Sequence, residues 1–275
     1  MNAFSKAFNR FKKDGFYIIL IDFITIFLLI FMVIFLRDYL GGLVGSAEKL
    51  GTDLQAINFG EIDKEKLADT IDKIQPIVFR YNLVFYFIFP VILFLVMGVL
   101  QGLSFGVAQE RSRKIFDKKY LLRFSLYTLP GFILGILFFS RLIELLSVTL
   151  LSELEVSYDQ FLANARITSV IFLLLIIVGY FSIIAYGMLL NTNIKKSFNE
   201  MLKIGIKKTY LFLPLLIAFA VVWLFVMLNL FTLMFSFSLD TSILLNLSYL
   251  AIFLAIFAYL KILNAAMVNK YQQEY

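Results

Sequence analysis

Asp22 is the residue with the clearest chemical role to explain, because it is an acid inside a long apolar run. It lies six residues after Phe16, where the run begins, and a helical rise of 1.5 Å per residue places it about 9 Å along a membrane helix. An ionisable group at such a depth is by default a functional candidate, here for proton or cation coupling. The alternative is a structural carboxylate that is neutralised by a cation such as Arg123 or Lys261.

Two amide side chains, Asn229 and Asn246, lie inside later apolar runs. If these two runs form a helical hairpin, both side chains fall near the same end of it and can bond each other. Hydrogen bonds between membrane helices contribute about 0.6 to 2 kcal/mol and need no substrate to explain them. We interpret both asparagines as interhelical contacts and keep them, with Asp22, as candidate intramembrane functional residues.

The residue types that most membrane enzymes use are missing from this sequence. The chain has no histidine and no cysteine, which excludes a Ser-His pair, an H-E-x-x-H zinc site and thiolate chemistry. One intramembrane aspartate cannot form an aspartyl dyad, and the phosphate-loop motif G-x-x-x-x-G-K-[ST] does not occur. We therefore expect no catalysis, no metal and no cofactor.

The elements that must position these residues are membrane helices. Of the 275 residues, 61% are hydrophobic, against about 45–50% in soluble domains, and the mean hydropathy is +0.89. Continuous apolar runs of about 20 residues predict helices rather than the alternating strands of a barrel. We expect an all-α integral membrane bundle of six helices, with spans near residues 16–36, 77–98, 120–140, 168–190, 211–235 and 243–263.

The basic residues gather on one side of this topology. Residues 1–15, 107–123, 191–208 and 261–275 carry 17 of the 25 lysines and arginines but only five of the 19 acids. Cytoplasmic loops of membrane proteins are enriched in Lys and Arg. The charge pattern therefore predicts a multi-pass protein of the cell membrane with both termini in the cytoplasm.

Short internal matches indicate a repeat within one transmembrane domain of residues 1–275. "SKAFN" before the first span resembles "KKSFN" before the fifth, and "LYTLPGFI" in the third span resembles "LFLPLLI" in the fifth. We predict three helical hairpins, at about 1–109, 110–193 and 194–275. The outer loops are expected at about 37–76, 141–167 and 236–242, and to be partly helical.

Basic amphipathic segments precede the odd spans. Phe4, Phe8 and Phe11 share one helical face in the first, and Ser197 is expected to cap a short helix with Glu200 as its capping-box partner in the third. Such segments either fix orientation only or bind a specific lipid or partner surface. The residues expected to contact inner-leaflet lipid are Lys6, Arg10, Lys12, Lys13, Arg111, Arg113, Lys114, Lys195, Lys196, Lys207 and Lys208.

This pattern of a basic "S/K-x-F-N" segment leading into a span, repeated along a chain rich in Phe, Leu and Ile, resembles a known group. It is similar to the uncharacterised archaeal and bacterial polytopic membrane proteins related to the membrane domain of some glycerophosphodiester phosphodiesterases. The resemblance implies a helical domain without catalytic activity. The catalytic part of those enzymes is a separate domain that has no counterpart in this sequence.

Three glycines at four-residue spacing, Gly98, Gly102 and Gly106, lie in "MGVLQGLSFG". They share about 80° of one helical face, which allows close packing within the molecule, a joint toward the following basic loop, or a dimer face. A helix from residue 77 to 105 would be about 43 Å long, so the last glycines should lie near the headgroups. We expect intramolecular packing, against Gly179, Ser182 and Gly187.

Together these features predict a non-enzymatic polytopic membrane protein that organises a membrane complex or interacts with lipid at the inner leaflet. The expected partners are anionic lipids and another membrane protein, and not nucleic acid. The alternative is a transporter or channel for a small or amphipathic solute, with Asp22 on its path. A polar crevice that reaches Asp22 would favour transport, and its absence would favour the first hypothesis.

Overall fold

The computed structural model describes residues 3–55, 64–109, 113–150, 158–190, 192–235 and 242–272, and these ranges are almost entirely helical with no strand. The all-α fold class is therefore confirmed. In chain order the elements are α1 (Ala3–Gln55), α2 (Lys64–Leu83), a π-helical turn (Val84–Ile88), α3 (Phe89–Gln109), a 3₁₀ turn (Arg113–Phe116), α4 (Lys118–Leu150), α5 (Tyr158–Tyr186), α6 (Ile194–Lys207), α7 (Thr209–Phe235) and α8 (Ser242–Gln272).

Six helical segments among the described residues are long and apolar enough to cross a membrane, as predicted. They are Ala3–Lys49, Asp69–Gln109, Lys118–Leu142, Leu162–Tyr186, Thr209–Val226 and Ser248–Gln272. The protein is thus a multi-pass membrane protein.

The helices continue beyond the predicted spans into the segments expected as outer loops. α1 extends to Gln55 and α4 extends to Leu150. Residues 37–76 and 141–167 are accordingly helical over most of their described length. Most of the third expected loop, 236–242, lies outside the described residues.

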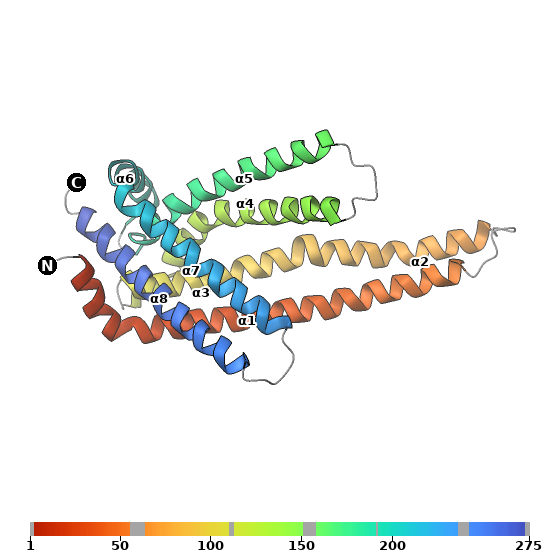
Figure 1. The fold of residues 1–275 in the computed structure, drawn as a ribbon, viewed down its shortest axis with the longest axis horizontal. Coiled ribbons are helices and arrows are strands. Elements are labelled where there is room, and N and C mark those ends of the chain that lie inside the picture. Colours follow the sequence, from red (N-terminus) through yellow and green to blue (C-terminus); the bar gives the residue numbers. More distant parts are fainter. Residues whose placement is uncertain are drawn as a thin grey trace. The chain divides into compact units, whose positions relative to one another are not determined.

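The chain divides into a larger compact unit, residues 1–23 with 98–275, and a smaller one, residues 24–97. Both boundaries fall inside helices, α1 and α3, rather than between the predicted hairpins. Within the larger unit α4 packs along α5 and α7 packs along α8, each pair antiparallel (Figure 1). The short helix α6 contacts α5, α7 and α8.

The smaller unit contains α1 from Ile24 to its end, all of α2 and the first turns of α3. A π-helical turn, Val84–Ile88, comes directly before Pro90. Proline lacks the N–H that would bond the carbonyl four residues earlier, and its ring clashes with that carbonyl. A π turn at this place widens the helix and accommodates the proline.

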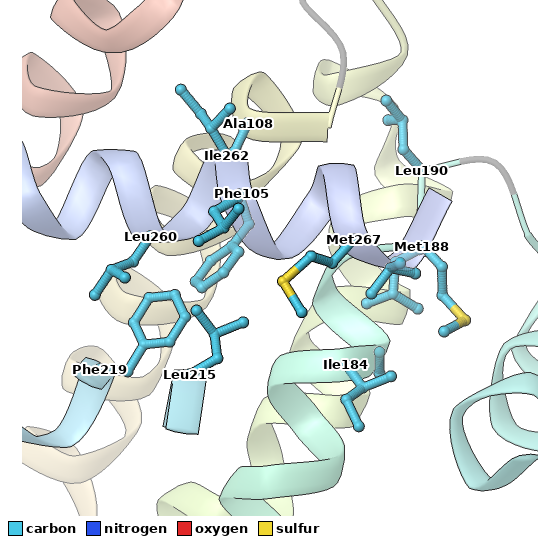
Figure 2. Close-up of a cluster of buried hydrophobic side chains, with 14 of the residues drawn as sticks. Phe105, Ala108, Ile184, Met188, Leu190, Leu215, Phe219, Leu260, Ile262 and Met267 are labelled. Carbon is cyan, nitrogen blue, oxygen red and sulfur yellow. The ribbon is translucent and has the colours of Figure 1, made fainter. Parts of the chain in front are cut away.

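The core of the larger unit is aromatic and aliphatic, and α1 and α3 to α8 all contribute to it. Figure 2 shows Phe105 of α3, Leu215 and Phe219 of α7 and Leu260 of α8 pointing toward a shared space. The ring of Phe105 lies 6.3 Å from that of Phe219. Van der Waals packing of these side chains holds α3, α7 and α8 together within the unit.

The segments before the odd spans adopt three different conformations. The first is already part of α1, the second is the 3₁₀ turn, and the third is the separate helix α6. The expected cap at Ser197 is wrong: α6 begins after Asn193, whose extended backbone makes it the N-cap residue. Ser197 lies one turn inside the helix, where it is buried, and Glu200 accepts a hydrogen bond from Gln272 at 2.6 Å.

Candidate functional site: a buried ion pair

The interior of the larger unit holds an ion pair between Asp22 of α1 and Lys261 of α8. Lys261 Nζ lies 2.7 Å from Asp22 Oδ1, and the side chains are 0% and 2% exposed, respectively. Lys261 is one of the two cations that the sequence offered as partners. The other, Arg123, donates to the backbone carbonyls of Lys119 and Thr192. The charge of Asp22 is therefore neutralised inside the protein.

Two side chains of α3 complete this site. Lys261 Nζ donates to Gln101 Oε1 at 2.8 Å and to Ser104 Oγ at 2.7 Å. With Asp22, these give the ammonium group three acceptors, one for each of its hydrogens. Ser104 Oγ and Gln101 Nε2 in turn donate to Asp22 Oδ1, at 2.9 and 3.2 Å. We call Asp22, Gln101, Ser104 and Lys261 the Asp22 cluster.

Aromatic rings enclose the ammonium group of Lys261. Its Nζ lies 4.8 Å from the ring centroid of Phe105 and 4.5 Å from that of Phe257. Both distances suit a cation–π interaction, which gains strength away from water. Phe257 itself meets Phe219 edge to face, with centroids 5.3 Å apart. The cation is thus stabilised both by oxygen acceptors and by aromatic faces.

The Asp22 cluster can act as a structural contact between helices. A buried ion pair is costly to break, by about 3–5 kcal/mol when one partner is removed, so the cluster fixes α1, α3 and α8 against one another. Asp22 Oδ2 accepts no hydrogen bond from any residue that the structure describes. Over the same part of the chain, no three acidic side chains lie together as metal ligands.

The sequence pointed to Asp22 and Lys261 but missed the rest of the site. Gln101 lies among the three spaced glycines, and Phe105 and Phe257 resemble the many other phenylalanines of the chain. The signal that could have found Gln101 and Ser104 is their three-residue spacing on α3. This spacing places two polar side chains on one face of an otherwise apolar helix.

The three spaced glycines of α3 lie against α4 and the 3₁₀ turn before it. The carbonyl of Gly102 accepts a hydrogen bond from the hydroxyl of Tyr120 at 2.7 Å. Side chains of the neighbouring element fill the space where each glycine would carry a Cβ. Those Cβ atoms would lie 3.0 Å from Ser125 at Gly98, 3.1 Å from Leu121 at Gly102 and 2.8 Å from Ile115 at Gly106.

The partner expected for these glycines, the fourth span, lies elsewhere. A Cβ on Gly179 would meet nothing within 4 Å, and one on Gly187 would approach Val268 of α8 at 2.7 Å. Ser182 donates to the carbonyl of Tyr127 at 3.1 Å. Ser182 of α5 therefore contacts α4, and Gly187, directly after α5, contacts α8.

Arg10, expected at the lipid, is engaged within the protein. Its guanidinium donates to the carbonyls of Val107, at 3.0 Å, and of Gln109, and it lies 3.5 Å from Asp14. The last carbonyls of a helix lack intrahelical donors and carry partial negative charge. Arg10 therefore caps the end of α3.

Gln109 at the same end joins α3 to the end of α5. Its side-chain oxygen accepts from the backbone N–H of Leu190 at 2.9 Å, and its side-chain nitrogen donates to the carbonyl of Tyr186 at 2.5 Å. The side-chain amide of Gln109 thus pairs with one backbone N–H and one backbone carbonyl at the end of α5 and just after it.

The other lysines of the expected lipid-contact set are exposed where the structure describes them, apart from Lys208, which is half-buried. Lys208 Nζ lies 4.7 Å from the ring centroid of Tyr271. The side chains of Arg111, Arg113, Lys114, Asn229 and Asn246 lie outside the described part of the chain.

An apolar pocket of about 440 Å³ opens between the beginning of α1, the beginning of α7 and the end of α8. We call it the α7–α8 groove. Nothing in the sequence predicted it, because its walls come from three segments that are far apart in the chain. Its lining residues are Ala3, Phe4, Tyr210, Leu211, Pro214, Leu215, Ala218, Leu260, Leu263, Met267, Lys270 and Tyr271.

Two further pockets lie in the described part of the chain, one lined by α6 and one by α2. Neither of them, nor the α7–α8 groove, is lined by a member of the Asp22 cluster.

A scan against models of protein families, a search of curated proteins and a search of solved structures each found no match. The resemblance stated from the sequence therefore stays a prediction.

Proposed function

We propose that this protein is a non-enzymatic membrane protein that interacts with anionic lipids at the cytoplasmic leaflet of the cell membrane. The observation that carries the proposal is the arrangement of α6, which is fixed to the bundle by one face and presents lysines on the other, with exposed apolar side chains beside them. A helix of this kind suits the boundary between acyl chains and anionic headgroups.

The buried face of α6 consists of small and apolar residues that pack on the other helices. Tyr180 of α5 donates to the carbonyl of Gly205 at 2.7 Å, which holds the end of α6 close to α5. The buried residues of this face are Ser197, Met201, Ile204 and Gly205.

The opposite face of α6 is open to its surroundings. Its exposed lysines are Lys195, Lys196, Lys203 and Lys207, and the exposed Ile206 lies among them. Two more large apolar side chains, Ile194 and Phe198, are exposed at the edge of the buried face. Apolar side chains enter the acyl region while lysines extend to the phosphates.

The beginning of α1 repeats this arrangement. Ala3 and Ala7 are buried against the larger unit, whereas Phe4 and Phe8 are exposed. Lys6, Lys12 and Lys13 are exposed as well. Two separate basic surfaces on one unit strengthen the attraction to an anionic leaflet, because each lysine near the surface contributes about 1 kcal/mol. The proposal extends to a role in organising a membrane complex on those lipids, with a second membrane protein as partner.

Binding to vesicles of defined composition tests the proposal. The protein is reconstituted at increasing fractions of phosphatidylglycerol in phosphatidylcholine, and enrichment of fluorescent phosphatidylglycerol around it is measured by energy transfer. The triple variant Lys195→Glu, Lys196→Glu and Lys203→Glu should reduce the enrichment about 100-fold in binding constant if the three charges act additively.

The matched control reverses three exposed cations on the side predicted to face outward, Arg37→Glu, Lys73→Glu and Arg166→Glu. It makes the same change in net charge and should lower the enrichment much less. Equal losses in the two triple variants would mean that net charge alone attracts the lipid. No enrichment around the wild-type protein would contradict the proposal directly.

Transport is the second candidate function, and the presence of a charged pair inside membrane-crossing segments favours it. The Asp22 cluster speaks against it, because Asp22 and Lys261 pair with each other at 2.7 Å and both side chains are buried. Solute flux into proteoliposomes, compared between the wild type and Asp22→Asn after both are shown to be folded, decides the question. Indistinguishable fluxes across a broad panel of solutes would leave transport without support.

A further inference from the structure

We infer that the α7–α8 groove is a binding site for one diacyl anionic phospholipid, with an acyl chain in the groove and the phosphate at Lys208 and Lys270. The inference rests on the lipid-interacting function proposed above and names the ligand class and the place where it binds. The lining of the groove, its direction along the helices and the charges at one of its ends support it.

The groove has the lining that an acyl chain requires. Its floor is apolar and buried: Leu260, Leu263 and Met267 of α8 and Leu215 of α7 are each less than one-tenth exposed. The volume of about 440 Å³ falls within the range of about 300–1,000 Å³ that is usual for ligand sites. A branched or flat polar solute would leave most of this surface without a partner.

The groove follows the helices for two to three turns. On α7 its lining extends from Tyr210 to Ala218, and on α8 from Tyr271 back to Leu260. At 1.5 Å per residue these distances are about 12 and 16 Å. Both helices have one end at the same end of the groove, because α7 begins at Thr209 and α8 ends at Gln272. An extended chain therefore fits with its head at the helix ends and its tail toward the middle of the spans.

Positive charge gathers at that end. Lys208 Nζ lies 4.7 Å and Lys270 Nζ lies 5.3 Å from the same ring, that of Tyr271. A phosphate near this ring would be attracted by both ammonium groups. Lys270 and Tyr271 both line the groove, so a phosphate at this place is continuous with a chain inside it. Charge complementarity thus selects an anionic phospholipid over a neutral one.

The test uses the full-length protein in detergent with dioleoyl phosphatidylglycerol that carries a photoactivatable diazirine in one acyl chain. Cross-linked peptides are mapped by mass spectrometry, and unlabelled phosphatidylglycerol, phosphatidylcholine or glycerol phosphate is added as competitor. We expect cross-links within residues 210–218 and 260–271, displaced by phosphatidylglycerol but not by phosphatidylcholine or glycerol phosphate. Displacement by phosphatidylcholine to the same extent would overturn the selection for an anionic head.

Two variants test the groove: one fills it with a larger side chain, and the other removes two positive charges at its end. Ala218→Phe places a ring in the groove at a half-buried position and should abolish the cross-links, whereas Ala165→Phe, at a half-buried position of α5, should leave them unchanged. The double variant Lys208→Gln and Lys270→Gln should weaken phosphatidylglycerol binding about 30-fold. Cross-links that persist in Ala218→Phe, or that spread evenly over the other lipid-facing helices, would overturn the inference.

The triple α6 variant separates this inference from the proposed function. It should lose the general enrichment of anionic lipid and still cross-link in the groove, because its three lysines do not line the groove. If the groove gives no cross-links while the wild type still enriches phosphatidylglycerol, the inference alone fails. If the wild type shows neither effect, both fail.

Discussion

Lys261 Nζ and Asp22 Oδ1 lie 2.7 Å apart although 239 positions of sequence separate the two residues. The contact joins the first and last helices of the described chain, and α3 supplies the remaining polar partners. In a membrane protein such a pair replaces some of the hydrophobic driving force that is missing between helices surrounded by lipid. The stability of the larger unit should therefore depend on the cluster as a whole.

Removal of either charge should destabilise the protein more than removal of both. Asp22→Leu and Lys261→Met, made singly, each leave one buried charge without its partner and should cost about 3–5 kcal/mol of unfolding free energy. The double variant should recover most of this loss, because it leaves no buried charge. Thermal unfolding in detergent measures all three, and additive losses in the double variant would contradict a direct pair.

The contact between α3 and α4 should not tolerate a methyl group at Gly106. A Cβ there would lie 2.8 Å from Ile115 Cγ2 and 3.1 Å from the hydroxyl oxygen of Tyr120, so Gly106→Ala should lower the unfolding free energy by about 1–3 kcal/mol. Gly135 of α4 is the control, since a Cβ there would meet nothing within 4 Å. Unfolding by denaturant should show no loss for Gly135→Ala, and equal values for the two variants would refute the packing argument.

The cap that Arg10 provides for α3 should be measurable by itself. Arg10→Met keeps the apolar stem but removes the donors to Val107 and Gln109, and we expect a loss of about 1–3 kcal/mol. Faster hydrogen exchange in the last turn of α3 should accompany the loss. Lys13→Met, at an exposed position nearby, controls for the change in charge and should alter neither measurement.

The position of α6 should depend on Tyr180. Its hydroxyl donates to the carbonyl of Gly205 at 2.7 Å, and Tyr180→Phe removes this bond with little change in volume. We expect a loss of about 1 kcal/mol and increased hydrogen exchange in α6. Tyr249→Phe, at an exposed tyrosine of α8, is the control, and an unchanged α6 in Tyr180→Phe would show that apolar packing alone holds the helix.

The sequence predicts the membrane helices well because the length and polarity of an apolar run report directly on the span. The depth of Asp22 also limits its partners to cations near the same end of other spans, and this condition selected Lys261 together with Arg123. A single sequence carries little information about the rotation of each helix about its own axis. This rotation determines that Gly102 contacts α4 rather than α5.

The parts that were missed depend on contacts between distant segments. Arg10 carries the same charge as the lysines around it, and only the position of the end of α3 distinguishes a cap from a lipid contact. The α7–α8 groove is formed by three separate helical segments, so no local sequence pattern predicts it. Ser197 shows the same limit on a smaller scale, because the backbone of Asn193 begins the helix four residues earlier than the side-chain pattern suggested.

The place of Lys261 on the last described helix has a consequence for biosynthesis. A ribosome delivers Asp22 to the membrane long before α8 is made, so the nascent protein carries an uncompensated carboxylate during most of its insertion. The arrival of α8 ends this period by supplying the ammonium group. A chain that stops before α8 lacks the ammonium group that neutralises Asp22.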